Sequence, residues 1–95
     1  MGVTSASAAG FDVQVDNFTA TGGISSAVMK VTNNTGADAE SVFIDCVFMS
    51  KDQKAIDIGK AVIAAIPAGG VAYDKASIAT SEGVQFVICD VIRHR

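Results

Sequence analysis

The sequence has very few of the residues on which enzymes and metal centres usually depend. It contains one histidine, His94, two cysteines and no tryptophan. Ser-His-Asp and Cys-His mechanisms need a histidine beside the nucleophile, and His94 lies in the tail Arg93-His94-Arg95, where we expect it to be solvated. A zinc site needs four ligands at characteristic spacing, which two distant cysteines and one histidine do not supply. We therefore predict no catalytic residue, no metal site and no cofactor.

Positive charge and aromatic side chains are also scarce. Seven Lys and Arg residues stand against ten Asp and Glu, for a formal net charge of -3, which is the wrong sign for a protein that binds phosphate backbones electrostatically. With five Phe, one Tyr and no Trp, the chain lacks an aromatic platform on which single-stranded nucleic acid or sugars could stack. The composition predicts no nucleic-acid partner and disfavours carbohydrate binding.

Long apolar runs are absent as well. No stretch without a charged residue is longer than residues 61–73, which are interrupted by Pro67 and Gly69-Gly70, whereas a spanning helix needs about 20 apolar residues. Residues 1–10 contain no Lys or Arg and no apolar signal-peptide core, so we expect a flexible leader there. Within it, Ala6-Ser7-Ala8 has the small-x-small character of an export cleavage site. The sequence thus predicts no membrane span and leaves export open.

What the chain does have is alternation of apolar and polar residues with a period of two, which is typical of half-buried β-strands. In the first such segment Phe11, Val13 and Val15 alternate with polar residues. Clusters of Gly, Asn, Asp, Ser and Pro interrupt the alternation at fairly even intervals, and these residues favour turns. Six segments result. The third, residues 43–49, is the most apolar and is expected in the centre of a sheet.

Six or seven short strands in one small domain cannot bury their apolar faces in a single open sheet, so two sheets must pack face to face. We therefore predict an all-β fold over residues 11–93, an immunoglobulin-like β-sandwich of six or seven antiparallel strands in two sheets. A small barrel is one alternative, and an α+β layer is another if residues 54–66 are helical.

Residues 54–66 allow two interpretations. Ser50 and Gln53 could form the capping box of a helix, and helical spacing is found among the apolar residues Ala55, Ile58, Val62 and Ile66. Gly59 and several β-branched residues oppose a helix, so we favour two short strands kinked at Gly59. In the next segment, residues 71–79, the side chains expected to point inward, with a bulge between them, are Val71, Tyr73 and Ile78.

Cys46 and Cys89 both fall in the apolar phase of their strands. In immunoglobulin-like topologies the third strand pairs with the sixth, which would bring the two cysteines within reach of a disulfide bond. Such a bond forms in an oxidising compartment. Alternatively both are free thiols that pack as small apolar side chains. The sequence leaves both states open.

The remaining polar motifs are best explained by solvated faces and turns. The carboxylates are spread over different segments, so we expect them to face water. Residues 33–40 carry several oxygen ligands, but their spacing does not match a calcium-binding loop and indicates a turn. Asn17-Phe18-Thr19 and Asn33-Asn34-Thr35 match the N-glycosylation sequon, which matters only in a glycosylating secretory pathway.

Several runs resemble the motifs of a known domain family. They are Val31-Thr32-Asn33-Asn34-Thr35-Gly36, residues 42–48, Ser50-Lys51-Asp52-Gln53-Lys54 and Ile66-Pro67-Ala68-Gly69-Gly70. These runs are similar to the V-x-N-x-(S/T)-G, V-x-V-x-x-x-F, D-x-x-G and L-x-P-G elements of FxLYD-type domains, small immunoglobulin-like sandwiches of bacterial exported or envelope proteins. Gln53 stands where that pattern has a turn glycine. The resemblance covers about residues 27–73 and implies a non-catalytic accessory or interaction domain, periplasmic or secreted.

We therefore expect a non-enzymatic domain that binds another protein or a second copy of itself. One physical route is strand addition at an open sheet edge, and the first strand, residues 11–18, is the candidate edge. The alternative function is that of a carrier for a small apolar ligand. Its cavity between the sheets would be lined by Phe43, Phe48, Phe86 and Met49.

Overall fold

A computed structural model of the chain describes residues 2–4, 6–8 and 10–95, which form eight strands and no helix. The all-β prediction is confirmed. No helix in the described ranges is long and apolar enough to cross a membrane. In chain order the strands are β1 (Gly2–Thr4), β2 (Ala6–Ala8), β3 (Phe11–Thr21), β4 (Ile24–Asn33), β5 (Ala39–Met49), β6 (Ala55–Ile66), β7 (Val71–Ala79) and β8 (Phe86–Arg93).

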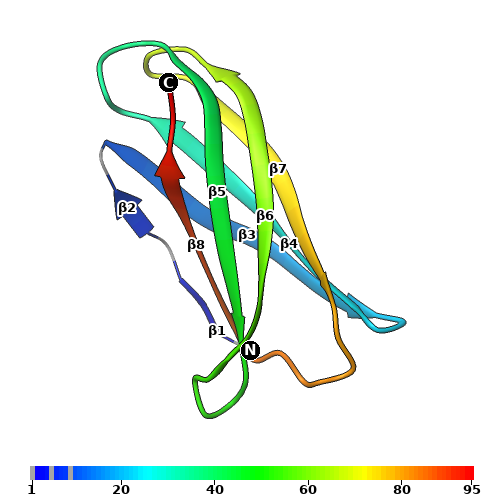
Figure 1. Cartoon of the computed structure of the whole chain (residues 1–95). Coiled ribbons are helices and arrows are strands. Elements are labelled where there is room, and N and C mark those ends of the chain that lie inside the picture. The colour runs from blue at the N-terminus through cyan, green and yellow to red at the C-terminus, as the bar shows by residue number, and fades with distance from the viewer. Residues whose placement is uncertain (1, 5, 9) are drawn as a thin grey trace.

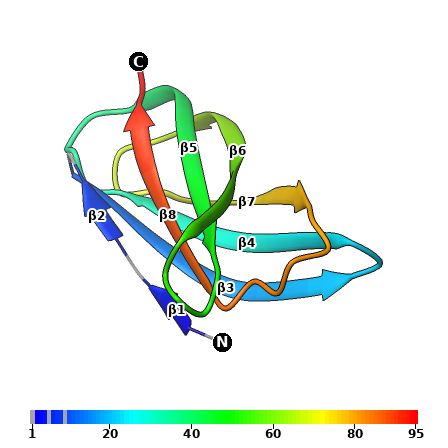
Figure 2. The same ribbon diagram turned by 60° about the horizontal axis from the view of Figure 1, so that its bottom comes forward.

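The strands form two four-stranded sheets that pack face to face (Figure 1). Sheet A has the order β1-β8-β5-β6 and sheet B the order β2-β3-β4-β7. The six long strands pair antiparallel, whereas β1 pairs with β8 in parallel. Figure 2 shows the strands of sheet A crossing over those of sheet B. The predicted sandwich of two sheets is thus confirmed, with the most apolar strand, β5, in the middle of sheet A.

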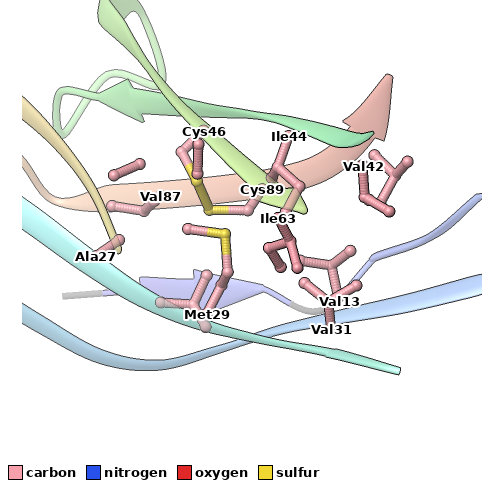
Figure 3. Packing of buried hydrophobic residues seen from close by; sticks show 14 of the residues in the cluster. Val13, Ala27, Met29, Val31, Val42, Ile44, Cys46, Ile63, Val87 and Cys89 are labelled. Atoms are coloured by element: carbon pink, nitrogen blue, oxygen red, sulfur yellow. A yellow bond between two sulfur atoms is a disulfide. The ribbon is translucent and has the colours of Figure 1, made fainter. Parts of the chain in front are cut away.

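The core lies between the sheets and is built from alternate residues of the long strands (Figure 3). In β4, for example, Ala27, Met29 and Val31 are fully buried while Lys30 stands on the opposite side of the strand. This is the pattern expected for a sheet with one face on the core. The largest fully buried apolar side chains are Phe11, Phe48, Met29, Ile44 and Ile66.

Residues 55–66 form one continuous strand, β6, and neither a helix nor two kinked strands. The pair that could have capped a helix, Ser50 and Gln53, closes the β5–β6 hairpin instead. The Gln53 N–H donates to the Ser50 carbonyl at 2.9 Å, and the Ser50 N–H donates to the Lys54 carbonyl at 2.9 Å. Both interpretations of this segment were therefore wrong, because the capping-box residues lie in a tight turn and β6 pairs with β5 without a break at Gly59.

Gly59 has a different role from the predicted kink. A Cβ atom at this position would lie 3.0 Å from Cε1 of Phe48 in the core and 3.2 Å from the carbonyl oxygen of Ser77 in β7. The glycine therefore allows β6, the edge of sheet A, to approach β7, the edge of sheet B. The sandwich closes along this side by direct contact between the two edges.

The start of β7 has the opposite phase from the predicted one. Its pairing with β4 is continuous, without a bulge, so the alternation set by buried Ala76 and Ile78 extends unbroken to the beginning of the strand. Val71 and Tyr73 are consequently 47% and 61% exposed on the outer face of sheet B. The prediction that both point inward was wrong because it assumed a bulge that the strand does not contain.

The region expected to be a flexible leader contains β1 and β2. β1 pairs with residues 86–88 of β8, and β2 pairs with residues 11–13 of β3. Each short strand thus covers part of an edge that would otherwise present unpaired backbone groups. The predicted edge strand, residues 11–18, is covered at its start, and within the described residues it has no neighbour on that side from Gln14 onward.

Candidate functional site

Cys46 and Cys89 are joined by a disulfide bond inside the core (Figure 3). They stand directly opposite each other on β5 and β8, with a Cα–Cα distance of 4.0 Å, and both are fully buried. The bond therefore links neighbouring strands of one sheet, whereas the disulfide of antibody domains links two sheets. Because no solvent reaches either sulfur, this is a structural cross-link rather than a reactive thiol site.

The C-terminal tail is held on sheet A. The Arg95 N–H donates to the Glu40 carbonyl at 2.7 Å, and the Glu40 N–H donates to the Arg95 carbonyl at 2.6 Å, so the β5–β8 pairing continues past the end of β8. His94 is exposed, yet its ring packs edge-on against Phe11 with the centroids 4.9 Å apart. Among the residues that the structure describes, no three His, Cys, Asp or Glu side chains gather in a way that could hold a metal ion.

The two glycosylation sequons lie in very different environments. Asn33 is fully buried, and its Nδ2 group donates to the carbonyls of Ala37 and Ile66, both at 2.8 Å. Its Oδ1 accepts hydrogen bonds from the Thr35 N–H and hydroxyl. In the folded protein Asn33 therefore has no amide hydrogen left for a glycan, and it organises the predicted turn. Asn17 is exposed on β3 beside a β-bulge.

The residues predicted to line a ligand cavity do not share one. Phe48 points into the core and is fully buried. Phe43, Met49 and Phe86 occupy the opposite phase of their strands and are half-buried on the outer face of sheet A. The alternation along β5 and β8 thus places the four side chains on two sides of the sheet, which contradicts the predicted cavity.

That outer face, formed by β6, β5 and β8, is unusually apolar. Across it, Val47 of the central strand pairs with Ile58 on one side and Ile88 on the other. A second apolar row, nearer the C-terminus, contains Phe43 and Val62. Residues 10–95 include seven large apolar side chains that are exposed, and four of them belong to this face: Ile58, Val62, Ile88 and Ile92.

A charged row separates the two apolar rows. Asp45 pairs with Lys60 on β6 and with Asp90 on β8. The Lys60 Nζ lies 3.2 Å from the Asp45 Oδ1. The Asp90 Oδ1 accepts a hydrogen bond from the N–H of Val91 at 2.9 Å. Like charges directly opposite each other disfavour strand pairing, so the contact with Lys60 offsets part of the repulsion between the two carboxylates.

Two arginines stand at the C-terminal end of the same face. The Arg93 guanidinium lies over the Phe43 ring, 4.2 Å from its centroid. The Arg95 Nη2 donates to the Ser41 Oγ at 2.9 Å. The sequence predicted only a solvated tail for Arg93-His94-Arg95. The signal for a candidate binding site was the pair of arginines two residues apart. Two guanidinium groups, each held by a neighbouring side chain, thus lie beside apolar side chains. Such an arrangement can bind a ligand through hydrogen bonds and apolar contacts.

Neither family models, nor curated proteins, nor solved structures give a match to this chain. Its function must therefore be inferred from the side chains of the outer face of sheet A.

Proposed function

We propose that this chain is a non-catalytic β-sandwich domain that binds another protein through the outer face of sheet A. The observation that carries the proposal is a row of apolar side chains that runs across three strands, with exposed Ile58 and Ile88 on either side of half-buried Val47. Single exposed apolar residues are normal on a protein surface, but a contiguous apolar patch rimmed by polar groups is typical of an interface. Here Ile58, Val47 and Ile88 form one unbroken row over three strands.

The outer face of sheet B provides an internal contrast. Polar pairs interrupt its apolar residues: Gln14 pairs with Lys30, and the hydroxyls of Ser26 and Ser77 are 2.7 Å apart in a hydrogen bond. Its exposed large apolar side chains, Ile24, Val71 and Tyr73, do not form a row across three strands. Exposed apolar residues that are interrupted by polar ones in this way are normal on a solvated surface. The difference between the two faces is the reason for assigning the interaction to sheet A.

The predicted route through the edge of β3 is less well supported than the face. β2 covers residues 11–13, and a bulge between Val15 and Asn17 interrupts the part that remains open. Bulges and charged residues such as Asp16 are common means of protecting an edge from added strands. Binding of a partner strand at the open edge of β3 is therefore the competing hypothesis, and it can be tested together with binding through the outer face of sheet A.

We also propose that the domain is of the FxLYD type and works outside the cytoplasm. The buried disulfide supports an oxidising compartment. Two of the shared motifs meet in space, because the Asn33 side chain of the first binds the Ile66 carbonyl of the second. Their glycines, Gly36 and Gly69, have φ angles of 86° and 72°, which explains why glycine is needed at both.

Site-specific photo-crosslinking in the cells that naturally make the protein tests the interaction. A photoreactive residue replaces Val62 on the proposed face or, as a matched control, Val71 on sheet B. Both are valines on edge strands, 51% and 47% exposed. We expect a discrete cross-linked product from position 62 and none from position 71, and the mass of the product shows whether the partner is another protein or a second copy.

The same experiment distinguishes the competing outcomes. A third photoreactive position, Thr19, lies in the open part of β3. A product from position 19 alone would favour strand addition. No product from position 62, or equal products from positions 62 and 71, would contradict binding through the outer face of sheet A.

A further inference from the structure

The end of β8 changes phase in a way that exposes an arginine. Val91 points into the core, so strict alternation would aim Arg93 inward as well. Instead, the β5–β8 register shifts between Phe43 and Ile44. His94, although exposed, then packs against Phe11 of the core, and Arg93 lies over the Phe43 ring on the outer face. Bulges that re-aim a side chain in this way are frequent beside binding sites.

The neighbouring strand, β5, has an unusual backbone conformation at the same end of the sheet. Ser41 has a φ angle of 49°, a left-handed conformation that is uncommon for any residue except glycine. Its hydroxyl accepts the hydrogen bond from Arg95. Backbone strain of this kind persists where the surrounding structure holds it, and it is concentrated at functional sites. Within the described residues neither Arg93 nor Arg95 lies within ion-pair distance of a carboxylate.

Two adjoining hollows lie around these arginines. One, of about 270 Å³, is lined by Phe43, Arg93, His94 and Arg95. The other, of about 310 Å³, shares Phe43 and Arg93 with the first. Its lining also includes the apolar side chains of Val62 and Ile92 and the ion pair of Asp45 and Lys60. The surface therefore presents a basic hollow and a mostly apolar hollow, whose two charged groups pair with each other, on either side of the stacked Arg93.

The geometry points to a carboxylate-binding site. We propose that Arg93 and Arg95 bind the side-chain carboxylate of a Glu or Asp residue in an extended segment of the partner protein. An apolar side chain two residues away in that segment occupies the neighbouring hollow. This inference rests on the proposed function, because it specifies the chemistry of the partner that the outer face of sheet A takes.

Three physical properties favour this ligand. The guanidinium group is a planar fork that donates two parallel hydrogen bonds to one carboxylate. Stacking on Phe43 holds the Arg93 fork in place before the ligand arrives, which lowers the entropic cost of binding. In an extended segment, side chains two residues apart point to the same side about 7 Å apart, a spacing suited to two adjoining hollows.

Titration of the full-length, isotope-labelled chain with short peptides, followed by NMR amide shifts, tests the site. The probe is acetyl-Gly-Leu-Ser-Glu-Gly-amide, which has no terminal charge. Its controls replace Glu by Gln or Leu by Ala. We expect saturable shifts centred on Phe43 and Arg93 with the Glu peptide, and binding at least about tenfold weaker with the Gln peptide, because charge-assisted hydrogen bonds are lost. The Leu-to-Ala peptide should bind more weakly while shifting the same amides.

The second part of the experiment titrates variants of the protein with the same Glu peptide. Arg93→Gln and Arg95→Gln should each weaken binding of the Glu peptide by about tenfold. Lys75→Gln, which removes one positive charge from the outer face of sheet B, should leave binding unchanged and serves as the matched control. Arg93→Lys keeps the charge and removes the fork, so its binding should also fall. Amide spectra of all four variants verify that they are folded.

Several results would overturn the proposal. They are equal binding of the Glu and Gln peptides, undiminished binding by both arginine variants, or no saturable shift up to about 10 mM peptide. Inorganic phosphate that shifts the same amides when the Glu peptide does not would identify a phosphate site instead. These failures are distinguishable from failure of the proposed function, because cross-linking from position 62 detects a partner of any chemistry.

Discussion

The Nδ2 group of Asn33 donates a hydrogen bond of 2.8 Å to the backbone carbonyl of Ile66, and both residues are fully buried. This contact joins the turn after β4 to the corner between β6 and β7, two segments that are far apart in sequence. Backbone hydrogen bonds reinforce it, because Asn33 N–H donates to Gly70 and the Asn33 carbonyl accepts from Gly69. One polar side chain thus fixes one end of the sandwich.

Asn33→Ala should lower the free energy of unfolding by about 3 kcal/mol, because it removes the side-chain donor of the buried Ile66 carbonyl and the acceptor of two hydrogen bonds from Thr35. Asn34→Ala is the matched control. The Asn34 side chain is exposed and donates to the Asp12 carboxylate at 2.7 Å, so its loss should cost less than about 1 kcal/mol. Urea unfolding of the three proteins measures both values. Equal losses from the two substitutions would show that Asn33 does not organise this end of the fold.

Reduction of the Cys46–Cys89 bond should lower the free energy of unfolding by about 4 kcal/mol, because an unfolded chain without the cross-link regains the entropy of a long closed loop. The comparison is urea unfolding of the native chain with and without a reductant. The double variant Cys46→Ala/Cys89→Ala should be insensitive to the reductant. A native chain whose midpoint does not move on reduction would argue against the cross-link that the structure contains.

Gly59→Ala should destabilise the fold by about 1 to 3 kcal/mol, because the added Cβ meets Phe48 and the backbone of Ser77 in a packed region. Gly83→Ala provides the contrast. Nothing lies within 4 Å of a Cβ at Gly83, and removing a glycine there should leave stability unchanged or raise it by up to about 1 kcal/mol. Thermal unfolding of both variants tests the close approach of β6 to β7.

Gln53→Gly should raise the free energy of unfolding by about 0.5 to 1 kcal/mol, since Gln53 has a φ angle of 62°, which glycine adopts without steric cost. Gln14→Gly, in the interior of β3, should lower it by a similar amount. A loss of stability in both variants would mean that the left-handed conformation of Gln53 is not a source of strain. The test also bears on the motif resemblance, in which this position is a glycine.

Much of the architecture could be predicted from alternation alone. The inward phases of β3, β4, β5 and β8 follow directly from residues such as Met29 and Phe48, because a strand places every second side chain on the core. The pairing of β5 with β8 followed from the general topology of sandwiches, and it brings Cys46 opposite Cys89. Even so, the residues alone left the state of the cysteines open, since both a disulfide and two thiols fit an apolar phase.

Apart from the strand at residues 55–66, the errors occurred where a single local feature sets the phase of a strand. Val71 and Tyr73 were expected inside because a bulge was assumed, and the uninterrupted pairing of β7 with β4 turned them outward. At the end of β8 a register shift does occur, and it moves Arg93 to the outer face. A register shift of one position exchanges the two faces of a strand. The spacing of apolar residues does not predict where along the strand such a shift occurs.

Local pattern and composition were therefore sufficient for the class of fold, the strands that carry the core and the scarcity of groups for catalysis. The tertiary structure decided which exposed residues lie together. The apolar rows around Asp45, the approach of β6 to β7 at Gly59 and the arginine pair beside Phe43 all join residues from different strands. The physical reason is that a side chain's phase within one strand depends on its neighbours in sequence, whereas its partners across a sheet depend on register, which is set by pairing, bulges and turns.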